Sequence, residues 1–214
     1  MGRGSYCYSA LPCSAEYSPI PFGAATRRMK YTWLSESHIP RLHEIRPEYV
    51  SDRYVRVVRT GQSPEISLSL QVESLGDKFR SQGLSIVRRR DREEIQSRIG
   101  SRSLQLVVED SGRLIALLDS EVESWRRVLR VWNLLVDQEY RRQGIGTELM
   151  HRAEEFGIER HCRAISADAQ ATNWPALTFY SKMGFEICGV DDHFYTNRDL
   201  ERKEVALFLY RELP

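Results

Sequence analysis

The residues with the clearest chemical signal form a short turn, Arg141-Arg142-Gln143-Gly144-Ile145-Gly146, between an apolar stretch and an amphipathic one. The start of a helix carries free backbone N–H groups and the positive end of the peptide dipole, so it binds phosphate readily. The two glycines allow a close approach of ligand oxygens to the backbone. The two arginines add positive charge at the rim. The turn therefore predicts a diphosphate-binding site, with a purely structural turn as the alternative.

The stretches on either side of this turn favour phosphate binding. Residues 128–136 are apolar and predict a central strand. Residues 146–158 predict a helix, in which Leu149, Ala153 and Phe156 continue one apolar stripe from Ile145. The spacing does not match the Gly-x-x-x-x-Gly-Lys-Ser/Thr or Gly-x-Gly-x-x-Gly phosphate loops. A strand that leads into a helix N-terminus is nevertheless the arrangement that anion capture needs.

The remaining pattern predicts an α/β protein whose central, mostly antiparallel mixed sheet is flanked by helices. Residues 65–74 alternate polar and apolar side chains and are expected to form a half-buried strand. Residues 1–28 lack periodicity and are expected to be a flexible extension of a domain at 29–214. Helices are expected after Ser35, at 88–94 and at 173–183, and further strands at 29–33, 104–108, 114–118, 164–167, 185–190 and 205–210.

The composition argues against several classes of protein. A net charge of +1 gives no general attraction to nucleic acid or to a membrane. The sequence contains no apolar run long enough to span a bilayer and no apolar segment typical of a secretory signal, so a cytoplasmic location is expected. The four cysteines lack zinc-site spacing, so no metal is expected. Cys188 is expected to be a buried thiol, and Cys7 and Cys13 are expected to be reduced, with a disulfide as the alternative.

Two motifs resemble those of the GNAT superfamily of N-acetyltransferases. Arg141-x-x-Gly144-x-Gly146 is similar to its Arg/Gln-x-x-Gly-x-Gly/Ala motif. Asn173-Trp174-Pro175-Ala176-x-x-x-Tyr180-x-x-x-Gly184-Phe185 is similar to its Asn-x-x-Ala-x-x-x-Tyr-x-x-x-Gly-Phe motif. The resemblance covers about residues 103–212. It implies the GNAT acyl-CoA N-acyltransferase fold for the domain and acetyl-CoA as cosubstrate.

The C-terminal part resembles a narrower group, the streptothricin (nourseothricin) acetyltransferases. The similar residues lie in 184–195 and 204–207, and Trp125 and Asp168 also fit. Members of this group acetylate an amine on the β-lysine part of the antibiotic. The group usually carries an acid in an Asp-Ile-x-Val pattern of the central strand, where this chain has Asn133. Either other acids hold the substrate ammonium or the substrate differs.

The resemblance also implies how acetyl-CoA binds. The central strand splays from its neighbour, and the backbone of Leu135 and Val136 pairs with the pantetheine arm in the gap. Asn173 helps to fix that arm, and Arg141 adds charge near the pyrophosphate. The amides expected to hold the pyrophosphate belong to Arg142, Gln143, Gly144, Ile145, Gly146 and Thr147.

The same resemblance implies direct transfer without a covalent acyl-enzyme. An alkylamine has a pKa of about 10 and must lose a proton before it attacks, so a base is needed. Asp168 is the candidate base, with turn capping as the alternative. Tyr180 is the candidate acid for the leaving thiolate, with packing as the alternative. Residues expected to contact the substrate are Trp125, Asn133, Asp191 and Tyr195.

The expected function is acetyl transfer to a primary amine of a small molecule, with a streptothricin-type antibiotic as the first choice. A GNAT enzyme that acts on a protein N-terminus or lysine is one alternative. A catalytically weak CoA-binding regulatory module is another. The expected partner is the small-molecule amine, with no nucleic acid or membrane, and the protein is expected to be a monomer or homodimer.

Overall fold

A computed structural model describes residues 29–81 and 89–214. The expected extension at 1–28, with Cys7 and Cys13, lies outside the described residues. The strands are β1 (Lys30–Trp33), β2 (Val50–Gln62), β3 (Glu65–Arg80), β4 (Ser103–Asp110), β5 (Arg113–Glu123), β6 (Val128–Val136), β7 (Ala164–Gln170), β8 (Glu186–Asp191) and β9 (Ala206–Glu212). The helices are α1 (Arg89–Ser97), α2 (Ile145–Glu159), α3 (Trp174–Lys182) and α4 (Asp199–Arg202), with the 3-10 helices η1 (Glu36–Glu44) and η3 (Gln138–Tyr140).

The described strands form a seven-stranded sheet in the order β1-β4-β5-β6-β7-β9-β8 and a separate β2-β3 hairpin. All neighbours in the large sheet are antiparallel except β6 and β7. These two are parallel because α2 crosses back between them. The prediction of an α/β fold with a mostly antiparallel sheet is confirmed.

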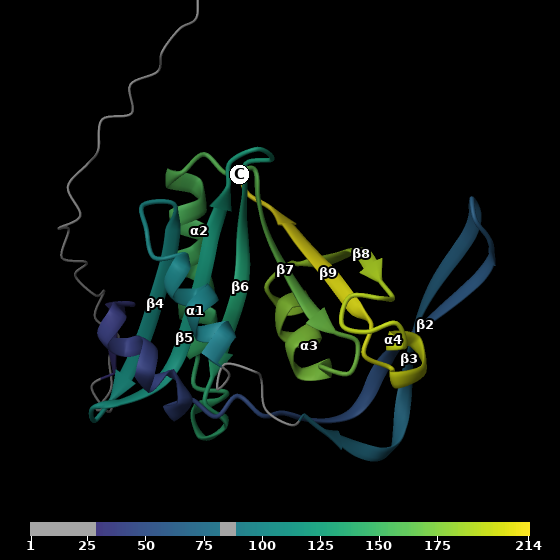
Figure 1. The fold of residues 1–214 in the computed structure, drawn as a ribbon, viewed down its shortest axis with the longest axis horizontal. Helices are drawn as coiled ribbons and strands as arrows, with labels where there is room; N and C mark the ends of the chain where they lie inside the picture. Colours follow the sequence, from purple (N-terminus) through teal and green to yellow (C-terminus); the bar gives the residue numbers. More distant parts are fainter. Residues whose placement is uncertain (1–28, 82–88) are drawn as a thin grey trace, which may run out of the picture.

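The pairing of β6 with β7 is short. It joins Val128 to Ala164, Leu129 to Ile165 and Arg130 to Ser166, and no pair follows. From Val131 onward β6 is paired only with β5 on its other side. Figure 1 shows the two strands diverging toward the ends that lead into α2 and α3. Both helices therefore begin at the end of the sheet where β6 has an open edge.

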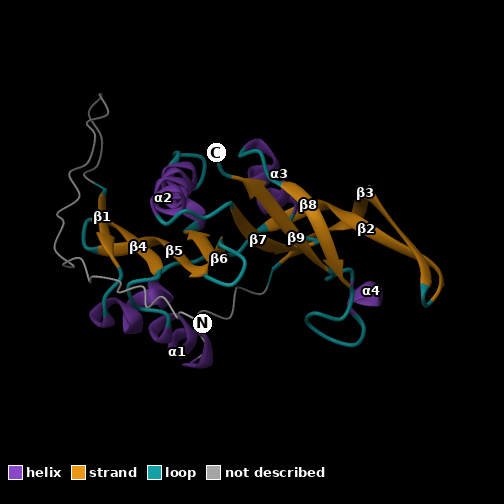
Figure 2. Ribbon diagram, turned by 90° about the horizontal axis from the view of Figure 1, so that it is seen from above, coloured by secondary structure: helices purple, strands orange, loops and turns teal. Residues whose placement is uncertain are grey.

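Helices cover the two faces of the sheet unequally. Figure 2 shows α2 and α3 on one face and α1 on the other, below the half of the sheet that contains β4 and β5. The α2 side contains a large buried core that includes Leu149, Ala153 and Phe156, the stripe expected from the sequence. A smaller buried cluster joins η1 and α1 to β4, β5 and β6. The α1 side of β7, β9 and β8 is therefore left for loops and a pocket.

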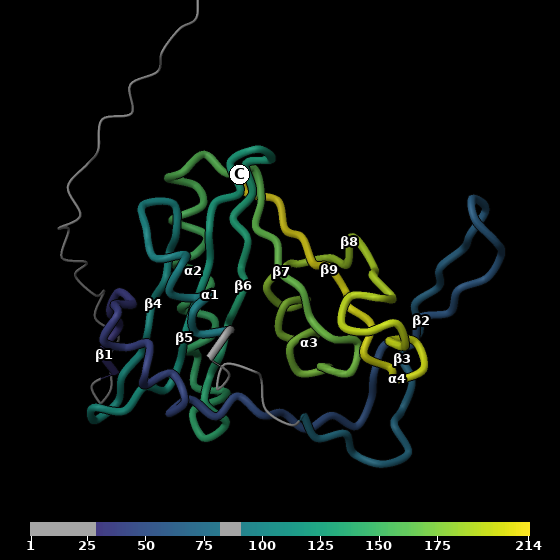
Figure 3. The backbone as a smooth tube through the Cα atoms, in the orientation of Figure 1, coloured from purple at the N-terminus to yellow at the C-terminus, as the bar shows by residue number. Residues whose placement is uncertain are grey.

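The β2-β3 hairpin differs from the expectation. The sequence predicts one half-buried strand at 65–74, but β3 is longer, and its apolar residues Ile66, Leu68, Leu70 and Val72 are 39–56% exposed. The buried positions of the hairpin belong instead to β2, which sequence reasoning did not assign to a strand, and they are Ser51, Tyr54, Val55 and Val57. Alternation defines two faces of a strand but does not supply anything to cover one of them. Figure 3 shows the hairpin extending away from the large sheet.

The helices of residues 29–81 and 89–214 include none that is both long and apolar enough to cross a membrane.

Candidate active site

The turn before α2 has the backbone geometry that the two glycines suggest. Gly144 is the N-cap of α2 with φ of +83°, and Arg142 also has a positive φ, +64°. The carbonyl of Gly144 accepts the first helical bond from the amide of Glu148 at 2.9 Å, and no side chain caps the helix. A β-carbon added at Gly144 would meet no atom within 4 Å. The first amides of α2 thus remain available to an anion in open space.

Arg141 does not supply the rim charge expected of it. Its guanidinium donates to the carbonyl of Val136 at 3.3 Å and to the carbonyl of Pro47 at 2.7 Å. Burial lowers its pKa, because removal from water disfavours the charged form. Arg141 therefore anchors the turn to the end of β6, and any contact with a cofactor rests on its backbone. Arg142 and Gln143 are exposed and carry the side chains that remain at the rim.

A buried carboxylate fixes the segment between β6 and the turn. Asp137 is fully buried and accepts from the amides of Arg46 at 3.1 Å and Glu139 at 3.0 Å, and it also forms an ion pair with Arg113. Burial raises its pKa, but these amides and guanidiniums outweigh burial, and the net pKa is lowered. Asp137 is therefore charged and holds η3 and the turn in place.

The open edge of β6 follows a bulge. Asp119 of β5 pairs with Asn133 and Ser120 pairs with Val131, so Trp132 has no partner on β5. A bulge bends and twists its strand. Leu135 and Val136 are paired with β5 on one side only. Apart from the Val136 carbonyl, which accepts from Arg141, the alternate backbone groups that point toward β7 have no strand partner among the described residues and can pair with an extended ligand, as in the addition of a strand.

Phe179 of α3 packs against the first turn of α2. Asn173 caps α3, since its side-chain oxygen accepts from the amide of Ala176 at 3.2 Å. Its side-chain nitrogen Nδ2 is therefore the atom that remains for the contact expected with a cofactor arm. A β-carbon at Gly146 would come within 3.5 Å of the Phe179 ring and 3.8 Å of Val136. Phe179 thus bridges α3, α2 and the end of β6.

The predicted base and acid lie together at the fork between β6 and β7. Asp168 follows the last paired residues and forms an ion pair with Arg130 of β6, in which the two side chains are 21% and 7% exposed. Burial raises the pKa of Asp168, although Arg130 opposes the shift. Tyr180 of α3 is buried, and its pKa is raised by burial and by the charge of Asp168. Tyr180 therefore keeps its proton at neutral pH.

A second phenol adjoins this pair. The backbone amide of Tyr195 donates to the buried Asp199 at 2.8 Å, which fixes the loop between β8 and α4. Burial and then the charges of Asp168 and Tyr49 raise the pKa of the Tyr195 phenol. The structure thus brings Asp168 within electrostatic range of two protonated phenols, one from α3 and one from the loop.

A pocket of about 460 Å³ lies on the α1 side of the sheet, where none of the helices in residues 29–81 and 89–214 covers it. Trp132, which sequence reasoning missed, lines it and is 44% exposed. Cys188 also lines the pocket and is exposed, so the expectation of a buried thiol is wrong. Its other lining residues are Glu123, Arg126, Arg130, Ser166, Gly189, Phe194, Phe208, Leu209 and Tyr210.

Three residues expected to contact the substrate have the following surroundings in the structure. Trp125 is 85% exposed, lies against Arg126 in the β5-β6 turn and does not line the pocket. The side chain of Asp191 accepts from the amide of His193 at 2.9 Å and so caps the turn that follows β8. Asn133 donates its side-chain amide to buried Asp119 at 2.9 Å. Of these two tryptophans, Trp132 in β6 lines the pocket, whereas Trp125 lies in the turn that precedes β6.

One group of side chains has metal-binding spacing. Asp191, Asp192 and His193 bring potential ligand atoms within 4.8 Å of one another. Asp192 is already paired with Arg59 and with His193. This cluster is therefore an interacting surface group and no part of the site at the fork.

Sequence comparison finds relatives among acetyltransferases. The chain is 33% identical over 87 residues to streptothricin acetyltransferase A of Bacillus subtilis (strain 168), covering 41% of this chain and 50% of the relative. It is 27% identical over 109 residues to streptothricin acetyltransferase of Escherichia coli, covering 48% and 63%. It is also 35% identical over 74 residues to N-alpha-acetyltransferase 30 of Xenopus laevis, covering 35% and 27%. The chain thus spans between about a quarter and two thirds of these curated relatives.

Solved structures share the fold over most of the chain. A nourseothricin acetyltransferase superposes with a TM-score of 0.72 at 22% identity, covering 87% of this chain and 99% of the other. A streptothricin acetyltransferase from Bacillus anthracis str. Ames, solved with acetyl coenzyme A, gives 0.68 at 18% identity, covering 88% and 99%. The sequence profile described as the Acetyltransferase (GNAT) family matches residues 73–185, more than half of the chain, which therefore belongs to the GNAT family.

Proposed function

We propose that the protein transfers an acetyl group from acetyl-CoA to a primary amine of a small molecule. One observation carries the proposal. The open edge of β6 runs from the Arg130–Asp168 ion pair to the uncapped N-terminus of α2. A single continuous edge thus joins a candidate base to a candidate diphosphate site.

The residues along this edge fit acetyl-CoA. The first amides of α2 suit its diphosphate, and the space beside Gly144 leaves room for the oxygens. The unpaired backbone groups near Leu135 and Val136 suit the amides of the pantetheine arm. Arg142 adds an exposed positive charge at the diphosphate end.

Acetyl-CoA supplies a thioester carbon that an amine attacks directly, so that a C–N bond forms and the C–S bond breaks. Asp168 accepts a proton from the incoming ammonium, and its raised pKa makes it a better base than an exposed carboxylate. Tyr180 gives its proton to the departing thiolate, leaving CoA with a free thiol. As the tetrahedral intermediate collapses to the amide, the nitrogen loses its second proton, which restores the Tyr180 phenol. The first proton passes from Asp168 to solvent, and the site is restored.

The acceptor that we place first is a streptothricin-type antibiotic. The support is the similarity to streptothricin acetyltransferases from two organisms together with the shared fold. A peptide N-terminus is the second candidate, supported by the similarity to N-alpha-acetyltransferase 30. Both acceptors present a primary amine, so the same base and acid serve either one.

The test measures thiol release from acetyl-CoA with three acceptors: streptothricin, a peptide with a free N-terminus, and streptothricin whose β-lysine amine is already acetylated. We expect turnover with streptothricin and none with the blocked antibiotic. Turnover with the peptide alone would replace the antibiotic by the second candidate. Tight binding of acetyl-CoA without turnover of any amine would contradict the enzyme and leave a CoA-binding regulatory module.

A further inference from the structure

Trp132 is the unusual side chain of the central strand. It occupies the bulge of β6, between buried Val131 and half-buried Asn133, yet it is 44% exposed. Part of its surface lines a concave pocket. A large aromatic surface in a pocket beside reactive groups is well suited to contact a ligand.

Two guanidiniums lie against the Trp132 ring. Arg98, one residue after α1, is 5.2 Å from the ring centroid, and Arg130 is 5.1 Å from it. These are attractive cation–π distances. One guanidinium comes from the α1 side of the molecule and the other from β6 itself, so together they restrict the rotation of the ring.

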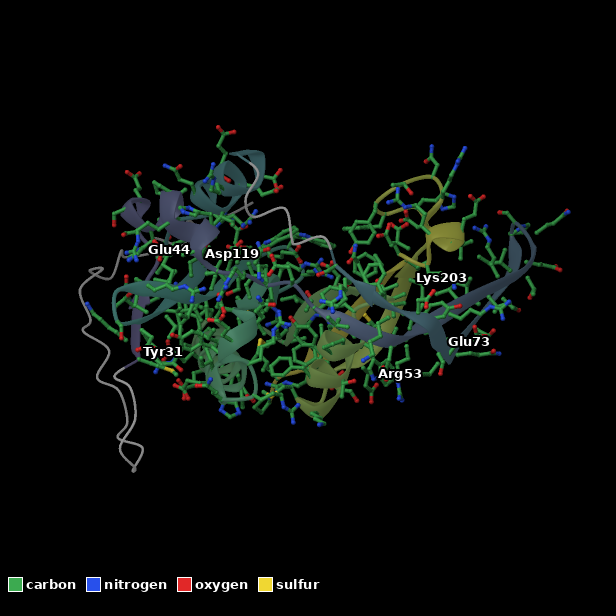
Figure 4. The ribbon with its side chains drawn as sticks, turned by 90° about the horizontal axis from the view of Figure 1, so that it is seen from below. Tyr31, Glu44, Arg53, Glu73, Asp119 and Lys203 are labelled. Atoms are coloured by element: carbon green, nitrogen blue, oxygen red, sulfur yellow. The ribbon has the colours of Figure 1, made fainter. Side chains whose placement is uncertain are left out.

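Arg98 is held in turn by a carboxylate beneath the sheet. Asp119 of β5 is fully buried and accepts two bonds from Arg98, at 3.2 and 2.6 Å. It also accepts from Gln105 at 2.7 Å and from Asn133 at 2.9 Å. Figure 4 labels Asp119 on the side of the sheet that carries η1 and α1. The only cation among these donors is Arg98, so the buried charge of Asp119 fixes Arg98 firmly.

The second guanidinium leads to the candidate base. Arg130 forms the ion pair with Asp168 and also contacts the Trp132 ring. Trp132 therefore stands between two ion pairs, Asp119–Arg98 and Asp168–Arg130. A change in either pair alters the support of the ring that faces the pocket.

We propose that Trp132 is the acceptor-binding wall of the site and that Asp119, acting through Arg98, is its positioning residue. This inference rests on the proposed function. Asp119 and Asp168 are each engaged by an arginine, and Glu123 at the pocket is paired with Arg126. The pocket therefore selects an amine joined to an apolar or planar segment that packs on Trp132, and no unpaired acid is needed to hold the body of the acceptor.

The test compares Trp132→Ala, Asp119→Asn and a control, Arg41→Gln, which breaks an ion pair with Glu109 and Glu44 away from the pocket. For the first two variants we expect the KM of the acceptor to rise about tenfold, with kcat and the Kd of acetyl-CoA changed less than about twofold. The control should leave all three unchanged. Trp132→Phe should recover most of the acceptor affinity, since a ring remains. Unchanged KM in folded Trp132→Ala would overturn the role of the wall.

A second variant, which leaves no unpaired charge buried, tests the positioning role even where Asp119→Asn does not fold. The double variant Asp119→Leu with Arg98→Met replaces the ion pair by apolar groups, a change that folds often tolerate. Quenching of tryptophan fluorescence by acrylamide, after subtraction of the same signal in Trp132→Phe backgrounds, reports the exposure of Trp132 without turnover. We expect stronger quenching in the double variant. Unchanged quenching would overturn the positioning role, whereas stronger quenching in a protein that turns over no amine would support it while refuting the proposed function.

Discussion

The two ends of the candidate site present different kinds of groups to a ligand, backbone groups at one end and side chains at the other. At the cofactor end the ligand groups are backbone amides and carbonyls, presented by the positive φ of Gly144 and by the unpaired edge of β6. At the acceptor end the surfaces are side chains, held by the ion pairs of Asp119 and Asp168. Arg141 illustrates the contrast, because its charge anchors the turn to the backbone and leaves the diphosphate site to the amides.

This difference predicts which binding or kinetic constant changes when residues at each end are substituted. Substitutions at the cofactor end act through backbone conformation and space, and they change the affinity for acetyl-CoA. Substitutions at the acceptor end act through charge pairing and ring position, and they change the KM of the amine. Asp168 and Tyr180 are the proposed base and acid between the two ends, so we expect substitutions there to change turnover itself.

The largest expected effect is a loss of kcat on substitution of Tyr180, between the two ends of the site. Tyr180→Phe removes the proton donor to the thiolate and should lower kcat by about 100-fold. The Kd of acetyl-CoA should change little, because the ring still packs between Phe179 and Phe185. Tyr195→Phe is the matched variant, since it also loses a phenol near Asp168. Steady-state kinetics measure kcat in both variants. An equal loss of kcat in Tyr180→Phe and Tyr195→Phe would contradict the assignment of Tyr180 as the proton donor.

The next effect is on stability. Asp137→Asn leaves Arg46 and Arg113 without their buried partner and should lower the free energy of unfolding by about 3 kcal/mol. The folded pKa of Asp137 is lowered, so its stabilisation is present above the unfolded pKa of about 4 and is lost as the pH falls through the folded value. Urea unfolding at pH 7 and at pH 3 checks this, and the difference between wild type and variant should shrink at the lower pH.

A smaller effect is expected from Gly144→Val. Valine resists a φ of +83° although space exists for its side chain. The Kd of acetyl-CoA should rise about tenfold, while the fluorescence of Trp132 stays unchanged. Gly112→Val, at a positive-φ turn away from the site, is the control for general strain. Calorimetry measures the affinity, and equal losses in both variants would argue against a local effect on the diphosphate site.

The smallest effect is expected from Arg142→Gln. The side chain is exposed, and its charge adds to a helix N-terminus that already attracts the diphosphate. The Kd of acetyl-CoA should rise about threefold at low salt, and the difference from wild type should vanish at high salt. A loss as large as that of Gly144→Val would mean that side-chain charge dominates this end too, which contradicts the comparison.

The cofactor end could be predicted from the sequence because its signals are local. A strand, a glycine turn and an amphipathic helix are adjacent in the chain, and β6, Gly144 and α2 lie where the pattern places them. The fold class followed from the same periodicity. A matched motif indicates Tyr180 as the candidate acid and the narrower resemblance indicates Asp168 as the candidate base, and the structure adds the ion pair of Asp168 with Arg130.

The acceptor end could not be predicted because it depends on strand register. Trp132 lies in a bulge that shifts the pairing between Asp119 and Ser120, and the sequence does not show where a bulge falls. The link from Asp119 to Asn133 is a cross-strand contact between residues far apart in the sequence. The length of the β2-β3 hairpin and the exposure of its apolar face were missed for a related reason, since alternation does not reveal what covers a strand.

The central claim is that acetyl-CoA binds along the open edge of β6 with its diphosphate at the start of α2. Amide chemical shifts of the 15N-labelled protein, followed during titration with acetyl-CoA, test this directly. The account predicts the largest shifts at residues 142–147 and 131–136, with small shifts in the β2-β3 hairpin. Saturable binding with its largest shifts in the hairpin or on β4, and none at 142–147, would contradict it.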